Sequence, residues 1–254
     1  MIEMIGKTDN VIIRLKNITK VYKVGIESIH ALEGIDLELH KNEYVAVMGA
    51  SGSGKSTLMN LIGCLDRASS GYYGLDNHDT TKMSEASLAQ IRNERIGFVF
   101  QSFELLSQLN ALKNVALPLI YSHNSMWSRR NLAKKALERV GLADRIKHKP
   151  NQLSGGEKQR VAIARALICN PSILLADEPS GNLDSKTSED IMALFDRLHR
   201  EGQTIVMVTH EENIARHAKR VIRMKDGQIY SNLAKQEYLD QSGMTQGDKQ
   251  EVVL

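Results

Sequence analysis

Cysteine is scarce in this chain, long apolar runs are missing, and charges of the two signs nearly balance. The two cysteines, Cys64 and Cys169, lie far apart and have no histidine at a metal-ligand spacing. This pattern argues against a disulfide or a zinc site, and we expect both thiols to be buried in a protein of a reducing cytosol. No apolar stretch reaches the roughly 18 residues that a membrane-spanning helix needs. Residues 1–7 also lack the charged start and apolar core of a signal peptide. We therefore expect a cytoplasmic chain, unless another protein holds it at a membrane.

The overall charge and apolar content are those of an ordinary globular protein. The net charge is only +3, and Lys and Arg form no dense basic arm, so we expect no nucleic-acid partner. Apolar residues make up 42% of the chain and charged residues 25%, which is typical of a folded domain. The length of 254 residues fits one large α/β domain, with or without an inserted lobe.

What the sequence does contain is a glycine-rich octet, G-A-S-G-S-G-K-S, at residues 49–56. It follows the apolar run 44–48 and precedes a helix-like stretch at 57–62, which is the strand–loop–helix context of a phosphate-binding P-loop. Glycines let successive backbone N–H groups surround an anion. In this interpretation Lys55 contacts the β- and γ-phosphates and the Ser56 hydroxyl binds Mg²⁺. A glycine-rich hairpin loop is the alternative. The residues predicted to hold the phosphates are Gly49, Ala50, Ser51, Gly52, Ser53, Gly54, Lys55, Ser56 and Thr57.

Apolar periodicity predicts two kinds of strand. Alternating apolar and polar residues at 13–18 and 35–39 predict half-buried strands of a small antiparallel sheet in the N-terminal part. Continuous apolar runs at 96–100, 173–176 and 204–208 are typical of parallel strands that are buried on both faces.

Helical patterns separate these strands, as expected for a parallel α/β core. One helix is predicted over 128–140, with Leu132, Ala136 and Val140 on its inner side. A second is predicted over 184–200, with an apolar inner side. The inward residues of this second helix are Ile191, Leu194, Phe195 and Leu198.

The end of the chain and the domain limits follow from similar signals. Asp226-Gly227 between two apolar runs predicts a hairpin over 220–232. We expect a single domain over residues 1–240, with an inserted helical lobe at about 102–165. Residues 241–254 are predicted to form a polar C-terminal tail.

Two carboxylates follow the apolar run 173–176. Asp177 and Glu178 stand where ligands meet the sheet of an open α/β fold. Asp177 could complete the coordination shell of Mg²⁺, and Glu178 could orient or deprotonate an attacking water. A helix-capping pair on the surface is the alternative interpretation.

A third motif, L-S-G-G-E-K-Q-R, occupies residues 153–160. Ser154 and Glu157 have the spacing of a capping box that starts a helix. The two glycines between them are unexpected, because each costs about 1 kcal/mol relative to alanine inside a helix. We infer that they let bare N–H groups press against a phosphate.

Together these motifs resemble those of the ATP-binding subunits of ABC transporters, over residues 11–235. The octet resembles Walker A, residues 173–178 resemble Walker B, and Leu153–Glu157 resembles the ABC signature. Further matches are Gln101 for the Q-loop, 180–184 for the D-loop, His210 for the H-loop, and Tyr22 where this family stacks an aromatic ring on adenine. The resemblance implies a P-loop NTPase fold of the α/β class, with a mostly parallel central sheet, an N-terminal antiparallel β subdomain and an inserted helical lobe.

The resemblance also implies a mechanism. Two copies of the chain would pack head to tail and bind ATP between the P-loop of one copy and Ser154, Gly155, Gly156 and Glu157 of the other. Glu178, His210 and Gln101 would be catalytic, with Glu178 as general base and His210 contacting the γ-phosphate. Ser56, Gln101 and Asp177 would hold Mg²⁺. A structural role is the alternative for His210, and simple packing is the alternative for Tyr22.

A narrower resemblance is to the lipoprotein-release and macrolide-efflux branch. It rests on residues 63–67, 98–101 with Leu105-Leu106, and 179–185. Glu157 and Ser180 depart from the common glutamine and threonine. The resemblance implies a separate integral membrane permease, peripheral attachment at the cytoplasmic face of the inner membrane, and ATP-driven export, efflux or lipoprotein release.

Other functions stay open at this point. An ATP-binding scaffold of a cell-division or envelope-remodelling complex is the main alternative, and a soluble ABC ATPase of DNA repair or translation is a further one. A small-molecule kinase would not need residues 153–157. The apolar stretch 103–121 follows Gln101, and we expect part of it to form a docking groove for the permease.

Overall fold

A six-stranded sheet forms the centre of the fold in the computed structural model, which describes residues 10–121 and 125–241. All neighbouring pairs run parallel except the edge pair β10 with β9, an antiparallel hairpin that turns at Asp226-Gly227 as predicted. The order across the sheet is β10 (Gln228–Ala234), β9 (Arg220–Lys225), β3 (Tyr44–Met48), β8 (Thr204–Val208), β7 (Ile173–Asp177) and β6 (Ile96–Val99).

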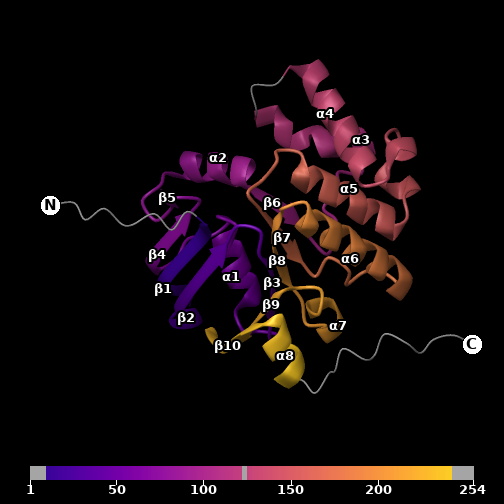
Figure 1. The fold of residues 1–254 in the computed structure, drawn as a ribbon. Coiled ribbons are helices and arrows are strands. Elements are labelled where there is room, and N and C mark those ends of the chain that lie inside the picture. Colours follow the sequence, from indigo (N-terminus) through magenta and orange to yellow (C-terminus); the bar gives the residue numbers. More distant parts are fainter. Residues whose placement is uncertain (1–9, 122–124, 242–254) are drawn as a thin grey trace, which may run out of the picture.

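The second sheet is antiparallel and lies beside the first (Figure 1). Its strands, in order, are β2 (Glu27–His40), β1 (Val11–Val24), β4 (Ser70–Leu75) and β5 (His78–Asp79). The predicted half-buried strands at 13–18 and 35–39 are confirmed within β1 and β2, although both strands run well beyond those limits. Strands β4 and β5 and helix α2 (Glu85–Arg95) were not predicted from the sequence.

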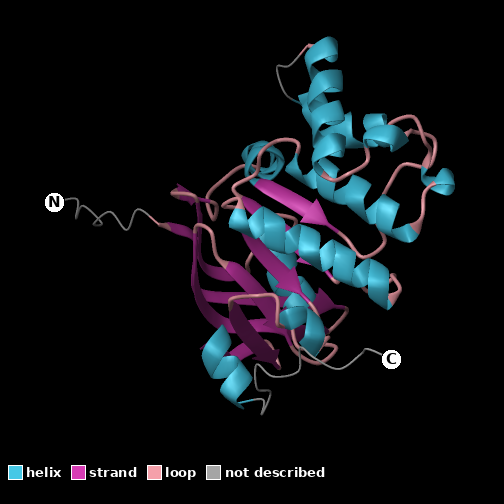
Figure 2. Ribbon diagram, turned by 45° about the vertical axis from the view of Figure 1, so that its right-hand side comes forward, coloured by secondary structure: helices cyan, strands magenta, loops and turns pink. Residues whose placement is uncertain are grey.

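Alternate residues of the central strands face two separate apolar clusters. Val45 and Val47 of β3 pack with helix α1 (Lys55–Ile62) and the antiparallel sheet. Ala46 and Met48 face the other way, toward the helices of the second layer. The sheet is therefore covered on both faces (Figure 2), which is why its strands read as continuous apolar runs.

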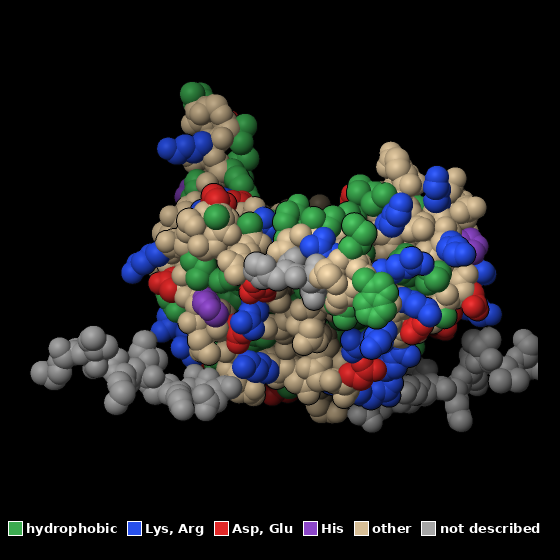
Figure 3. All heavy atoms as spheres, turned by 90° about the horizontal axis from the view of Figure 1, so that it is seen from above, with side chains coloured by type: hydrophobic (Ala, Val, Ile, Leu, Met, Phe, Trp, Pro, Cys, Tyr) green, Lys and Arg blue, Asp and Glu red, His purple; other side chains and the backbone are tan. Residues whose placement is uncertain are grey.

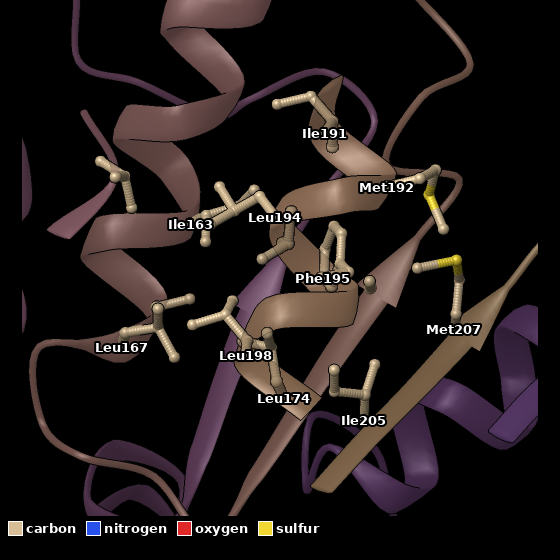
Figure 4. Close-up of a cluster of buried hydrophobic side chains, with 14 of the residues drawn as sticks. Ile163, Leu167, Leu174, Ile191, Met192, Leu194, Phe195, Leu198, Ile205 and Met207 are labelled. Carbon is tan, nitrogen blue, oxygen red and sulfur yellow. The ribbon is translucent and has the colours of Figure 1, made fainter. Parts of the chain in front are cut away.

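The second layer contains α6 (Ser185–Arg200) and α5 (Gly155–Leu167). Figure 4 shows Phe195 and Leu198 of α6 between Ile163 of α5 and Ile205 of β8. The predicted inner side of α6 is confirmed, because its residues named above are buried.

The remaining helices join these layers. Helices α3 and α4 pack with α5 above the sheet, at the top of Figure 1. Their bounds, with those of the short helices, are α3 (Ala111–Ala116), η1 (Leu117–Tyr121), α4 (Met126–Arg139), η2 (Ala143–Arg145), η3 (Pro150–Gln152), α7 (Glu212–Ala215) and α8 (Lys235–Gln241). We refer to α3, η1, α4 and α5 as the helical lobe. The predicted domain limits of 1–240 and the lobe limits of 102–165 stay predictions, and residues 242–254 of the predicted tail lie outside the described residues.

Two details of the sequence analysis were wrong. Val140 is buried and Ala136 packs against the core as predicted, but Leu132 is exposed, and Ala133 and Leu137 are the fully buried residues of α4. Cys64 is buried as expected, but Cys169 is only half-buried, and both are free thiols.

Candidate nucleotide-binding site

Four neighbouring strands of the central sheet end at the same edge, and each is followed by predicted site residues. The P-loop follows β3, Gln101 follows β6, Glu178 follows β7, and His210 follows β8. Because β3, β8, β7 and β6 are consecutive and parallel, their carboxyl ends place these four segments side by side.

The octet leads from a strand into a helix, so the hairpin alternative is wrong. Gly54 is the N-cap of α1 and Lys55 is its first residue. The Lys55 ammonium group folds back over the loop and donates to the carbonyl oxygens of Gly49, at 2.8 Å, and Ala50, at 2.7 Å. The largely buried Lys55 ammonium group is therefore bonded to the backbone at the start of the P-loop.

Two glycines of the loop are required by its geometry. A Cβ on Gly49 would come within 2.3 Å of the Met224 carbonyl oxygen, and one on Gly54 within 2.7 Å of the Ala31 carbonyl oxygen. Both residues also have positive φ, at 154° and 99°, where side chains are disfavoured. Inside the loop, the buried Ser53 hydroxyl has no hydrogen-bond partner among the described residues. An unpaired buried donor at this point suits an anion.

The two carboxylates after β7 differ in environment. Burial and the adjacent charge of Glu178 raise the pKa of Asp177, and Lys55 opposes this shift. Glu178 has a left-handed backbone, with φ of 42°, and its N–H donates to the Val208 carbonyl at 2.9 Å.

This conformation aims Glu178 at the loop after β8. Its Oε1 lies 2.6 Å from Nδ1 of His210, whose side chain is 63% exposed. The helix-capping alternative for the carboxylate pair is wrong, because Asp184 caps the next helix by accepting from the Thr187 N–H at 3.0 Å. Of the structural roles considered for His210, burial in the core is wrong, since this ring is exposed.

Gln101 contacts the predicted D-loop of the same chain. A Cβ on Gly181 would come within 2.5 Å of the Gln101 Nε2, so the amide lies directly on this glycine. The Asn182 side chain also donates to the Gln101 carbonyl at 3.1 Å.

Two residues of α5 that the sequence analysis did not select hold these loops. Gln159 is fully buried, and its Nε2 donates to the Pro179 carbonyl at 2.7 Å. Arg165 donates to the carbonyls of Phe103, at 2.9 Å, and Glu104. Phe103 and Glu104 have positive φ, at 62° and 49°, respectively. The sequence signal that could have identified Gln159 and Arg165 is a polar residue on the inner side of a helix that is otherwise apolar there.

The capping box at the start of α5 is present as predicted. The Glu157 N–H donates to Ser154 Oγ at 3.2 Å, and the Ser154 N–H donates to Glu157 Oε2 at 2.8 Å. A hydrogen bond from Arg145 lowers the pKa of Glu157. Among the described residues, no hydrogen bond joins residues 154–157 to the P-loop of the same chain.

Packing within the chain gives a second reason for a glycine in this segment, beside the predicted phosphate contact. A Cβ on Gly156 would lie 2.4 Å from Cγ2 of Thr187, and one on Gly155 would lie 3.0 Å from Cδ2 of Leu183. Packing within the chain therefore disfavours a side chain at position 156. The phosphate contact stays a prediction.

Tyr22 lies on β1 and is 36% exposed. Its hydroxyl donates to Asp66 Oδ2 at 2.7 Å, and the Lys20 ammonium lies 4.7 Å from the ring centroid. Burial, followed by the neighbouring Asp66, raises the pKa of this phenol. The ring is thus fixed in position and partly open to solvent.

The donor set suits a metal ion that is held only partly by protein. Among residues 10–121 and 125–241, no group of three or more His, Cys, Asp or Glu side chains could enclose a metal. Mg²⁺ is commonly bound by one or two protein oxygens together with phosphate oxygens and water. The half-buried Asp177 carboxylate and the exposed Ser56 hydroxyl are oxygen donors of this kind.

Comparison with known proteins agrees with this geometry. The sequence model of the ABC transporter family matches residues 32–181. The ABC transporter ATP-binding protein YknY of Bacillus subtilis is 55% identical over 217 residues, which cover 85% of this chain and 94% of the relative. The macrolide export ATP-binding/permease protein MacB of Chlorobaculum tepidum is 52% identical, and the match covers 92% of this chain but only 36% of that protein.

A solved structure extends the likeness to three dimensions. The dimeric post-hydrolysis state of the ATP-binding cassette MJ0796, bound to ADP and Pi, superposes with a TM-score of 0.80. It is 48% identical and covers 88% of this chain and 98% of its own. MJ0796 comes from Methanocaldococcus jannaschii. In the part of this chain that the structure describes, no helix has the length and apolar character to cross a membrane.

Proposed function

Because the chain belongs to the ABC transporter family, we propose that it is the ATP-hydrolysing motor subunit of a transporter whose membrane-spanning subunit is a separate chain. The observation that carries this proposal is the meeting of the P-loop, Gln101, the Asp177–Glu178 pair and His210 at one edge of the sheet. MacB, which is named as a macrolide export ATP-binding and permease protein, supports a role in export or efflux.

Each site residue takes a role that its position supports. The P-loop N–H groups and Lys55 bind the phosphates, and the partly open ring of Tyr22 stacks on the base. Glu178 accepts a proton from the attacking water, because its carboxylate already bonds to His210 and is held by a fixed backbone turn. His210 is exposed enough to reach the γ-phosphate while it orients Glu178.

Magnesium fits the same edge of the sheet. Ser56 and Gln101 would hold the ion directly, with Asp177 behind them. Bound Mg²⁺ would neutralise charge on the β- and γ-phosphate oxygens. The raised pKa of Asp177 supports this assignment, because a nearby cation would favour the charged carboxylate that burial disfavours.

The active form would be a homodimer. Residues 154–157 form the N-terminus of α5, where the N–H groups of the first helical turn suit an anion. They make no described hydrogen bond with their own P-loop, so a second copy would supply the nucleotide that they contact. The dimeric form of MJ0796 supports this arrangement.

The permease would dock in a groove beside Gln101, at the cytoplasmic face of the membrane. A groove of about 1060 Å³ lies there between α2, β6 and the helical lobe. Its lining includes Leu65, Phe98, Phe100, Glu104 and Tyr121. Leu105 packs into the core and does not line the groove, so the predicted docking stretch is only partly used.

Substitution of the proposed base tests the function. Glu178→Gln keeps the shape of the side chain but cannot accept the proton, so it should slow hydrolysis and trap an ATP-bound dimer. Gel filtration with ATP should show a species of twice the monomer mass, and the matched variant Glu138→Gln on the outer helix α4 should not. A Glu178→Gln protein that stays monomeric under saturating ATP would contradict the proposal.

A further inference from the structure

Large apolar side chains are exposed at the outer end of the helical lobe. Ile120 and Tyr121 at the end of η1 are 55% and 84% exposed, and Met126 and Trp127 at the start of α4 are 87% and 76% exposed. We call these four residues the apolar tip. Figure 1 shows both segments at the top of the lobe, away from the two sheets. Solvation of four such side chains is unfavourable, so a less polar partner is expected for them.

Met126 of the apolar tip continues a face of α4 that is buried in the following turns. Met126 is seven residues before Ala133 and eleven before Leu137, so all three lie on one side of the helix. Ala133 and Leu137 are fully buried within the lobe, whereas the first turn of α4 projects beyond it. The apolar stripe therefore runs on into a region where the described chain provides no cover.

Helix α4 is also strongly basic. Its fourteen residues contain five cationic side chains and one acidic residue, Glu138. The cationic residues are Arg129, Arg130, Lys134, Lys135 and Arg139. Within the described residues, Lys134 pairs with Glu138 and Arg139 with Glu201, while Arg130 and Lys135 form no ion pair.

Arg130 is next to the apolar tip. It follows Met126 by four residues and Trp127 by three, so its guanidinium group shares a helix face with both. Figure 3 views the molecule from above Figure 1, and hydrophobic and basic side chains are mixed over its right-hand half, where the helical lobe lies. Aromatic and aliphatic side chains beside unpaired cations are the composition that favours the interface of an anionic membrane.

We propose that the apolar tip inserts among the headgroups of an anionic lipid bilayer while the basic residues of α4 contact the lipid phosphates. This inference rests on the proposed function, because Tyr121 of the tip also lines the groove assigned to the membrane subunit. A permease seated in that groove would hold the tip on the membrane side of the molecule. Lipid contact would then fix the tilt of the motor subunit and add to its attachment.

The chain carries its own probe for this contact, because Trp127 is its single tryptophan. Vesicles of equal parts phosphatidylcholine and phosphatidylglycerol should move its emission to shorter wavelength, and lipids brominated near the headgroup should quench it. Vesicles of phosphatidylcholine alone and soluble glycerol phosphate should have no effect. High salt should reverse the shift, because the attraction to the surface is screened.

Charge and apolar contact can be separated by two variants that keep the probe. Arg130→Glu should lower vesicle partitioning at least tenfold, since each basic residue near an anionic surface contributes about fivefold. Met126→Ser should also lower it. The matched control is Arg200→Glu, an equal charge change at the exposed end of α6, and it should change partitioning much less.

The proposal is overturned if anionic vesicles leave Trp127 emission unchanged, or if Arg200→Glu weakens partitioning as much as Arg130→Glu does. An emission shift produced only by detergent-solubilised permease would assign the tip to a protein partner and would overturn it too. None of these results affects the dimer trapped by Glu178→Gln, which is measured without lipid. Failure of the lipid contact is therefore distinguishable from failure of the proposed function.

Discussion

Gly156 offers a way to separate packing from phosphate binding in the signature segment. In Gly156→Ala, the new Cβ would lie 2.4 Å from Cγ2 of Thr187, and the side chain at 156 is enclosed by the start of α6. Overpacking of this kind costs about 1–3 kcal/mol. Alanine recovers about 0.5–1 kcal/mol of the helix penalty of glycine. The midpoints of these ranges give a net loss of about 1 kcal/mol in the free energy of unfolding, with an upper limit of about 2.5 kcal/mol.

A second substitution removes the clash and leaves the backbone unchanged. Thr187→Ser deletes Cγ2 but keeps the hydroxyl that bonds to Asp184 at 2.6 Å. The double variant Gly156→Ala/Thr187→Ser should regain the lost stability in urea unfolding. It should nevertheless dimerise poorly with ATP in the Glu178→Gln background if the N–H groups near Gly156 must approach a phosphate closely.

The two readouts give distinct refutations. If Gly156→Ala unfolds at the same urea concentration as the unmodified chain, the packing argument is wrong. If the double variant regains both stability and full ATP-dependent dimerisation, packing alone explains the glycine, and the phosphate argument from the sequence is wrong.

Two further predictions concern the loops around the site. Asp177→Asn should raise the stability of the nucleotide-free protein at neutral pH while Mg²⁺-dependent hydrolysis is lost. Because the pKa of Asp177 is raised in the folded chain, ionisation of this carboxyl destabilises the fold. The gain from asparagine should therefore appear as pH rises through that pKa and vanish in acid, where aspartic acid and asparagine are both neutral. Urea unfolding at several pH values measures this, and an equal gain in acid would contradict it. Arg165→Lys should lower kcat and leave KM for ATP nearly unchanged, because lysine cannot bond both the Phe103 and Glu104 carbonyls as arginine does. Steady-state kinetics checks this. A raised KM with unchanged kcat would show that Arg165 does not position the loop after Gln101.

Helix α5 is bonded to the loops on which these predictions bear. Gln159 and Arg165 lie on the helix that begins with the signature segment, and they bond to the segments that follow Glu178 and Gln101, respectively. A displacement of α5 would therefore shift the segments that carry Gln101 and Glu178. The same displacement of α5 would change the shape of the groove beside Gln101, because Arg165 also lines that groove.

The sequence by itself determined the features that depend on local chemistry. The octet, the apolar strands, the capping box of Ser154 and the Asp226-Gly227 hairpin could all be recognised, because each is encoded by residues within one turn or strand. The family resemblance then supplied the proposed roles of Gln101, Glu178 and His210, because the motifs occur in the same order along the chain.

Tertiary structure alone decided which distant residues meet. The bond between Glu178 and His210, the contact of Gly156 with Thr187 and the hold of Arg165 on the Gln101 loop all join segments that are far apart in sequence. The exposed face of α4 likewise depends on where its neighbours end, and a helical pattern shows only that one side is apolar. Local pattern fixes the type of an element, whereas contacts across the fold fix its rotation and its partners.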